Sequence, residues 1–130
     1  FEKKVALLKF YPGFEPLIIS DLMKKGYSGI ILEGTGLGHV SKECYNIIET
    51  CIKNGMIIGM TSQCIWGRVR MTVYSSGRKL LQLGVIPLEN MLSETALVKL
   101  MWILGNFNEN KKELLVKNLA YEITDRSPLK

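Results

Sequence analysis

Short apolar runs alternate with amphipathic segments along this chain. Residues 5–10, 29–33 and 56–61 are mostly apolar with little polar alternation, as expected of strands covered on both faces. A briefer run, Val85-Ile86, precedes Pro87. Apolar strands separated by helical segments predict a parallel sheet with right-handed crossovers.

The segments between and after these strands have helical spacing of apolar residues. Ser41 suits the N-cap of one helix that continues through about Lys53, and Ser93 with Glu94 opens another that Gly105 ends. Residues 62–74 have neither a helical nor a strand period and are predicted to form an ordered loop. The remaining helices are expected over residues 16–25, 77–84 and 111–118.

These elements predict an α/β fold, a small open parallel sheet of about four strands flanked by helices. It would be a three-layer domain of the flavodoxin-like or Rossmann-like kind, built from residues 1–118. Residues 119–130 are more polar and are expected to form a C-terminal tail. Because the chain starts with Phe1 and enters a strand at once, we expect it to be excised from a longer polypeptide.

Composition limits the classes of partner. The net charge is +5, but the basic residues stand in separate pairs without interleaved aromatic residues, which favours a solvated basic surface over a nucleic-acid groove. No apolar run is long enough to predict a membrane span. Cys44, Cys51 and Cys64 lack CxxC spacing, so we expect no metal site and reduced thiols in the cytoplasm.

Candidate chemistry lies where two strands end, at residues 33–39 and 61–74. Ligands of open α/β sheets bind outside the carboxyl ends of the strands. The glycines of the first loop fit neither the dinucleotide-binding fingerprint nor the P-loop, which leaves a tight turn or a close approach of another chain. His39 could act as a base or simply satisfy nearby backbone, and Cys64 would need His39 within reach to act as a nucleophile. Glu33 ends an apolar strand, where a carboxylate is costly unless it is paired or exposed.

Three segments carry a resemblance to a known family. They are GIILEGTGLGHV at residues 29–40, MTSQCIWGRVRMTVYSSGRKLLQLGVI at residues 60–86 and MLSETALVKLMWILG at residues 91–105. In order and spacing they resemble the C-terminal domain of type I L-asparaginase-like amidohydrolases, and among these the amidohydrolase subunits of archaeal glutamyl-tRNA(Gln) amidotransferases. The resemblance implies a threonine nucleophile in a preceding domain with a Thr-Gly-Gly-Thr signature. This chain contains no such signature, so we expect no catalytic residue in it and no activity of this domain alone.

The resemblance also implies that the first loop closes the active site of a second protomer in a homodimer. The residues expected at this substrate-binding or dimer-interface loop are Gly34, Thr35, Gly36, Gly38 and His39, with Tyr74 as a further candidate. The implied parent protein releases ammonia from glutamine or asparagine. A partner subunit, which would hold ATP, Mg²⁺ and most of the Glu-tRNA(Gln) contacts, uses that ammonia to form Gln-tRNA(Gln). The alternatives are a domain of a free-standing type I L-asparaginase and a non-catalytic dimerisation module.

Overall fold

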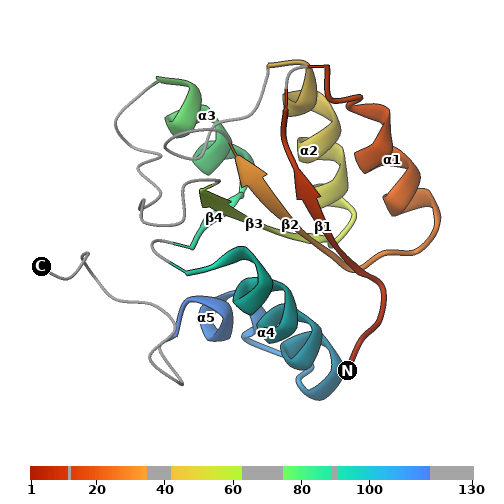
Figure 1. The fold of residues 1–130 in the computed structure, drawn as a ribbon. Coiled ribbons are helices and arrows are strands. Elements are labelled where there is room, and N and C mark those ends of the chain that lie inside the picture. The colour runs from red at the N-terminus through yellow and green to blue at the C-terminus, as the bar shows by residue number, and fades with distance from the viewer. Residues whose placement is uncertain (12, 35–41, 63–74, 89–90, 118–130) are drawn as a thin grey trace, which may run out of the picture.

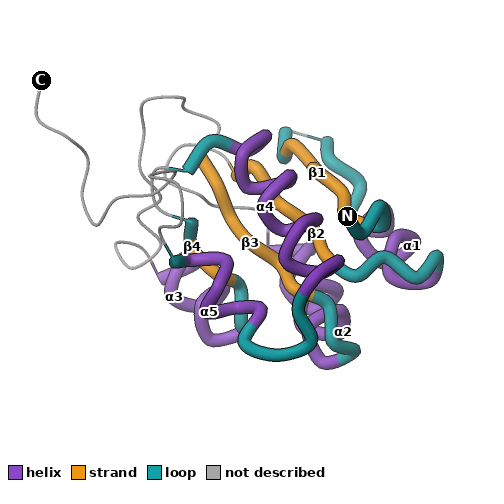
Figure 2. The backbone as a smooth tube through the Cα atoms, turned by 90° about the horizontal axis from the view of Figure 1, so that it is seen from below, coloured by secondary structure: helices purple, strands orange, loops and turns teal. Residues whose placement is uncertain are grey.

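The computed structural model describes residues 1–11, 13–34, 42–62, 75–88 and 91–117 (Figure 1). Four parallel strands form one sheet, and helices cover both of its faces (Figures 1 and 2). This arrangement confirms the predicted α/β class and the sheet of about four strands. The elements are β1 (Val5–Lys9), α1 (Leu17–Lys24), β2 (Gly29–Gly34), a 3₁₀ turn (Lys42–Cys44), α2 (Tyr45–Lys53), β3 (Ile57–Ser62), α3 (Ser75–Leu83), β4 (Ile86–Pro87), α4 (Ser93–Asn106) and α5 (Lys111–Val116).

Each strand of the described sheet pairs with its neighbour in sequence, in the order β1-β2-β3-β4. The described sheet therefore has no reversal of strand order, the feature that marks the binding crevice of many open α/β sheets. The location of a site must instead be inferred from what the strands carry at their carboxyl ends.

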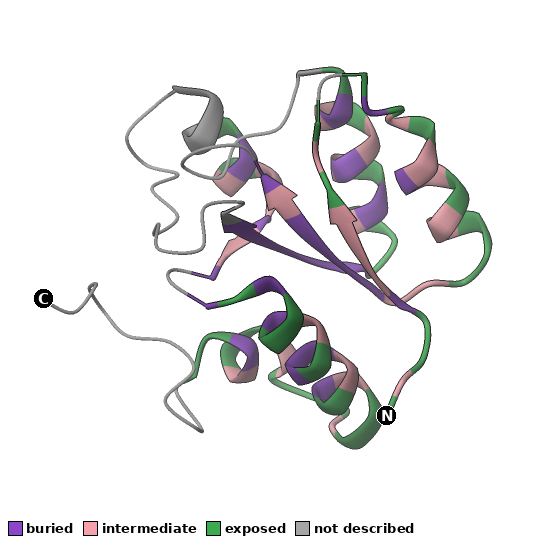
Figure 3. Ribbon diagram, viewed as in Figure 1, coloured by how far each residue is buried: buried purple, intermediate pink, exposed green. Residues whose placement is uncertain are grey.

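One core layer fills the space between the sheet and helices α1, α2 and α3. Ile30 and Met60 reach into it from the sheet, and Ile19, Ile48 and Leu80 reach it from the three helices, all fully buried. These helices turn their purple, buried sides toward the sheet in Figure 3. Right-handed crossovers explain why all three helices lie on one face.

The second core layer lies between the opposite face of the sheet and helices α4 and α5. Ile31 and Ile57 point into it, because successive side chains of a strand alternate between faces. Two glycines allow close packing here. A Cβ on Gly29 would lie 2.7 Å from Leu100 Cδ2, and one on Gly59 would lie 2.8 Å from Leu88 Cδ1. The absence of these side chains lets large apolar residues approach the strands closely.

Several predicted helix boundaries differ from the structure, and α3 begins at Ser75, two residues before its predicted start. The helix expected from Ser41 begins with the 3₁₀ turn, and α2 starts only at Tyr45 with Cys44 at its N-cap. Such tighter turns are frequent at helix starts. Ser41 itself lies outside the described residues.

The predicted end of α4 was also wrong, because this helix continues through Gly105 to Asn106. A Cβ at position 105 would lie 2.9 Å from the backbone nitrogen of Glu2. Gly105 therefore admits the amino-terminal segment against the helix, and it does not end the helix. The Asn106 side chain donates a hydrogen bond to the carbonyl of Trp102, 2.8 Å away.

The loop predicted over residues 62–74, apart from Ser62, and the tail predicted over residues 119–130 lie outside the described residues. The division into residues 1–118 and a tail therefore stays a prediction. Among the helices that are described, none combines the length and the apolar character that crossing a membrane requires.

Candidate functional site

A row of three polar side chains crosses the sheet at its carboxyl edge. Lys9 of β1 is the register partner of Glu33 of β2, which in turn pairs with Thr61 of β3. Val5, Ile31 and Ile57 on the same strands pack against α4. Because side chains alternate along a strand, Lys9, Glu33 and Thr61 lie on this same face.

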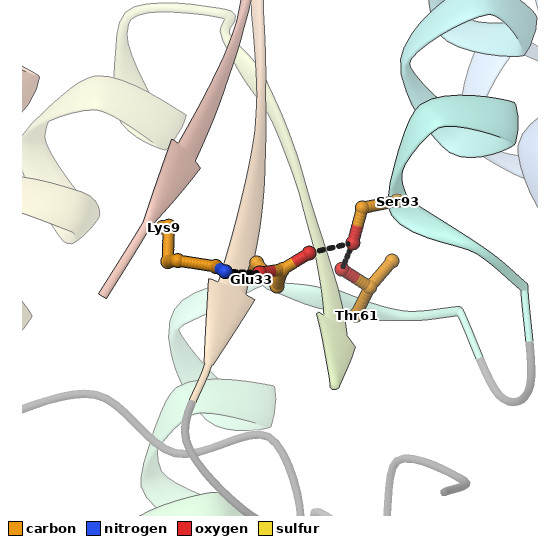
Figure 4. A network of polar contacts seen from close by, with 4 residues as sticks. All are labelled: Lys9, Glu33, Thr61 and Ser93. Atoms are coloured by element: carbon orange, nitrogen blue, oxygen red, sulfur yellow. Dashed lines mark hydrogen bonds and ion pairs between the residues drawn. The ribbon is translucent and has the colours of Figure 1, made fainter. Parts of the chain in front are cut away.

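The first residue of α4, Ser93, joins this row (Figure 4). Its hydroxyl donates a hydrogen bond to Glu33 Oε1 at 2.6 Å, and Ser93 Oγ lies 2.6 Å from Thr61 Oγ1. Lys9 Nζ lies 3.4 Å from the other carboxylate oxygen, Oε2. Together these four side chains form what we call the edge network: Lys9, Glu33, Thr61 and Ser93.

The direction of the hydrogen bonds follows from the number of hydroxyl protons. Ser93 has one proton and gives it to the carboxylate of Glu33, so the hydroxyl of Thr61 must donate to Ser93 Oγ. The hydrogen bonds are therefore donated from Thr61 to Ser93 and from Ser93 to Glu33. Both hydroxyl groups have a defined orientation.

Burial decides which contacts of the edge network matter most. Thr61 is 0% exposed and Ser93 is 4% exposed, whereas the Lys9 side chain is 67% exposed. An ion pair with so exposed a partner contributes little. Glu33, whose side chain is 15% exposed, accepts the Ser93 hydroxyl at the amino-terminal end of α4, whose dipole favours a negative charge. The carboxylate that the sequence marked as costly is thus paired.

The predicted loop residues are only partly described. Gly34 is buried, ends β2 and pairs with Ser62 of β3. Thr35, Gly36, Gly38, His39 and Tyr74 lie outside the described residues, as does Cys64. Their roles, including any contact between Cys64 and His39, stay predictions.

Sequence reasoning did not identify Lys9 or Ser93 as site residues, and it included Thr61 only as the first residue of a candidate loop. Ser93 was predicted only to open a helix, and α4 does begin at Ser93, with Leu92 at the N-cap and no side-chain hydrogen bond from that cap. A signal was available in the apolar run of β3, which ends in the polar Thr61 beside the polar end of β2. The hydrogen bond between Thr61 and Ser93, which are 32 positions apart, becomes visible only in the folded structure.

A cavity of about 580 Å³ lies at the opposite, amino edge of the sheet. It is lined by residues such as Glu2, Ser28, Asn54 and Lys111. Ser28 and Met56, which also line it, directly precede β2 and β3. The cavity is therefore separate from the edge network. Within the described ranges, His, Cys, Asp and Glu side chains form no group of three or more that could hold a metal ion.

Several archaeal proteins are similar to this chain over nearly its whole length. It is 53% identical over 125 residues to the D-type subunit of glutamyl-tRNA(Gln) amidotransferase from Sulfolobus acidocaldarius and 54% identical over 125 residues to that from Pyrococcus abyssi. Each match covers 95% of this chain and 28% of the relative. The chain thus spans less than a third of the length of these curated relatives.

Solved structures share the fold. The thermostable L-asparaginase from Thermococcus kodakarensis matches with a TM-score of 0.86 at 30% identity, over 95% of this chain and 38% of that chain. L-asparaginase I from Vibrio cholerae matches with a TM-score of 0.82 at 27% identity, over 93% and 38% of the two chains.

The family model described as the glutaminase/asparaginase C-terminal domain matches residues 4–114. This range contains every described helix and strand except the last two residues of α5. The chain therefore belongs to the glutaminase/asparaginase C-terminal domain family.

Proposed function

We propose that this chain is the C-terminal domain of the amidohydrolase subunit of a glutamyl-tRNA(Gln) amidotransferase that works in the cytoplasm. The whole subunit would release ammonia from glutamine or asparagine. A partner subunit would use ATP, Mg²⁺ and that ammonia to convert Glu-tRNA(Gln) into Gln-tRNA(Gln), and would hold most of the tRNA contacts.

One observation carries this proposal over the related asparaginases. The chain is 53% and 54% identical to two proteins named as the D-type subunit of that amidotransferase, but 30% and 27% identical to the two L-asparaginases of known structure. All four matches cover at least 93% of the chain. The difference is therefore not an effect of a shorter alignment.

Within that subunit, the chain would supply half of a pocket. The segment from Gly34 to His39, with Tyr74, would reach the active site of a second protomer in a homodimer. The support from the described residues is positional: Gly34 is the last residue of β2, at the carboxyl edge of the sheet, and directly follows Glu33 of the edge network. The nucleophilic threonine that forms the acyl intermediate would lie in the preceding domain. The isolated chain should therefore not hydrolyse amides.

The test is ammonia release from glutamine and asparagine by the full-length protein. It is measured alone, with the partner subunit, and with the partner subunit plus Glu-tRNA(Gln) and ATP. The proposal predicts release that rises strongly only when the partner and the charged tRNA are both present. Uncharged tRNA serves as the control for an effect of nucleic acid in general.

A free-standing L-asparaginase is the second candidate, favoured by the TM-score of 0.86 to the Thermococcus kodakarensis enzyme. Equally fast release by the full-length protein alone, indifferent to tRNA, would establish it and reject the coupled enzyme. Absence of release under every condition, from a folded full-length protein, would leave a non-catalytic dimerisation module.

A further inference from the structure

We infer that the outward side of α4 is an interface, and that the domain preceding residue 1 covers it in the full-length protein. The inference rests on the proposed function only in requiring such a domain, and it is independent of the reaction that the domain catalyses. It concerns residues outside the edge network and outside the predicted loop.

Helix α4 is apolar on two sides. Its side toward the sheet carries fully buried residues, Ala96, Leu100 and Ile103. On its outward side, Val98 and Trp102 lie about one turn apart and are 51% and 37% exposed. Exposed polar residues stand near the two ends of the helix, at Glu94, Thr95 and Asn106. Because a helix that is apolar on both sides is typical of a buried position, the middle of α4 points to a covering surface.

Two aromatic residues extend this apolar side. The ring of Phe107 meets Trp102 edge-on, with ring centroids 5.2 Å apart. Phe1 is 73% exposed, and its Cα would lie 3.1 Å from a Cβ on Gly105, three positions after Trp102. We call Phe1, Val98, Trp102 and Phe107 the α4 patch. Aromatic side chains supply large contact areas, and tryptophan is enriched where interfaces are most tightly packed.

The amino-terminal residues select the occupant of the α4 patch. The backbone N–H of Glu2 donates a hydrogen bond to the carbonyl of Met101 at 3.0 Å, and the amino end lies beside the last turn of α4 (Figure 1). The chain spans 28% of its relatives and matches a family described as a C-terminal domain, so the proposed subunit has a larger domain joined at residue 1. A domain tethered beside a patch is present there at high effective concentration, an advantage that a second copy of the chain lacks.

The experiment compares the accessibility of the α4 patch in this chain and in the full-length protein. Each is prepared as the Val98→Cys variant, and the rate of thiol labelling by a maleimide is measured under native conditions by mass spectrometry. The inference predicts labelling at least about tenfold slower in the full-length protein, because a domain docked about nine-tenths of the time leaves the thiol open for the remaining tenth.

Asp21→Cys is the matched control, because Asp21 is an exposed residue of α1, on the opposite face of the sheet. It should be labelled equally fast in both proteins. The original proteins give the background from their own cysteines, of which Cys44 and Cys51 are buried.

Equal labelling of Val98→Cys in the two proteins overturns the inference. Protection that disappears when the full-length protein is diluted to monomers assigns the patch to a second copy and overturns it as well. Should Val98→Cys fail to fold, hydrogen exchange of the original proteins replaces labelling: slower exchange of the α4 amides in the full-length protein supports the interface, and equal exchange rejects it.

The interface and the proposed function fail separately, since labelling does not depend on catalysis. Ammonia release that ignores tRNA rejects the coupled amidotransferase, and protection of Val98→Cys would still support the interface in an asparaginase. Release that depends on tRNA, together with equal labelling, rejects the interface alone.

Discussion

Replacing Ser93 by aspartate separates two roles that a serine at a helix start can have. As an N-cap, serine is about as good as aspartate, so the exchange would be nearly neutral. In this structure, Leu92 is the N-cap of α4 and the Ser93 hydroxyl bonds Glu33 at 2.6 Å. Ser93→Asp would instead place a second carboxylate against Glu33.

The magnitude follows from two terms. A hydrogen bond to a charged group contributes about 1.5–3 kcal/mol, and this one is lost. Two like charges about 4 Å apart repel by about 4 kcal/mol at an effective dielectric constant near 20, although rotation of the new side chain relieves part of that. We expect Ser93→Asp to lower the free energy of unfolding by at least about 3 kcal/mol, and Ser93→Ala by about 2 kcal/mol.

Urea unfolding of the chain, followed by circular dichroism, measures this difference. A fall in the midpoint with an unchanged m value reports a loss of stability rather than a change in the denatured state. If Ser93→Asp unfolds within about 0.5 kcal/mol of the original chain, the serine acts as a cap, and the edge network contributes little.

Three further predictions concern Cys51 and the loop. Burial raises the pKa of the Cys51 thiol, so the folded chain favours the neutral thiol. The stability that this preference gives the folded state is fully present below about pH 8.5, the usual pKa of a thiol, and is lost as the pH rises through the pKa of the folded state. The free energy of unfolding in urea, measured between pH 7 and 10.5, should therefore fall more steeply for the original chain than for Cys51→Ala, and parallel curves would contradict this. Gly36→Val should cut amide hydrolysis by the full-length protein at least about tenfold while this domain stays folded, since a β-branched side chain prevents close approach; unchanged hydrolysis would remove that role. His39→Ala should raise KM for the amide by about tenfold if the imidazole contacts substrate, and an unaltered KM would leave it a structural residue.

Strands β2 and β3 were predictable because short apolar runs that are bounded by turn residues and separated by helical segments favour buried parallel strands. Residues 29–33 and 56–61 correspond to β2 and β3 within one residue at each end. Helix ends were harder to predict, because Gly105 resembles a helix terminator in the sequence, whereas its missing Cβ makes room for Glu2, over 100 positions away.

The site was predictable only to the level of a sheet edge. Glu33 could be recognised as a carboxylate that needs a partner, but Ser93 becomes that partner only when α4 packs on the face opposite α1, α2 and α3. Local patterns do not specify which face a returning helix covers. The edge network therefore had to come from the three-dimensional arrangement.

The central claim is that this domain completes a pocket whose other half lies on a second protomer. It is tested most directly with two inactive full-length variants, Gly36→Val and one lacking the nucleophilic threonine of the preceding domain, which are mixed, dissociated and reassembled. Random pairing makes about half of the dimers mixed, and each mixed dimer has one site with both halves intact, so about a quarter of all sites are active. The account predicts recovery of about a quarter of the normal ammonia release, and a mixture that stays inactive would contradict it.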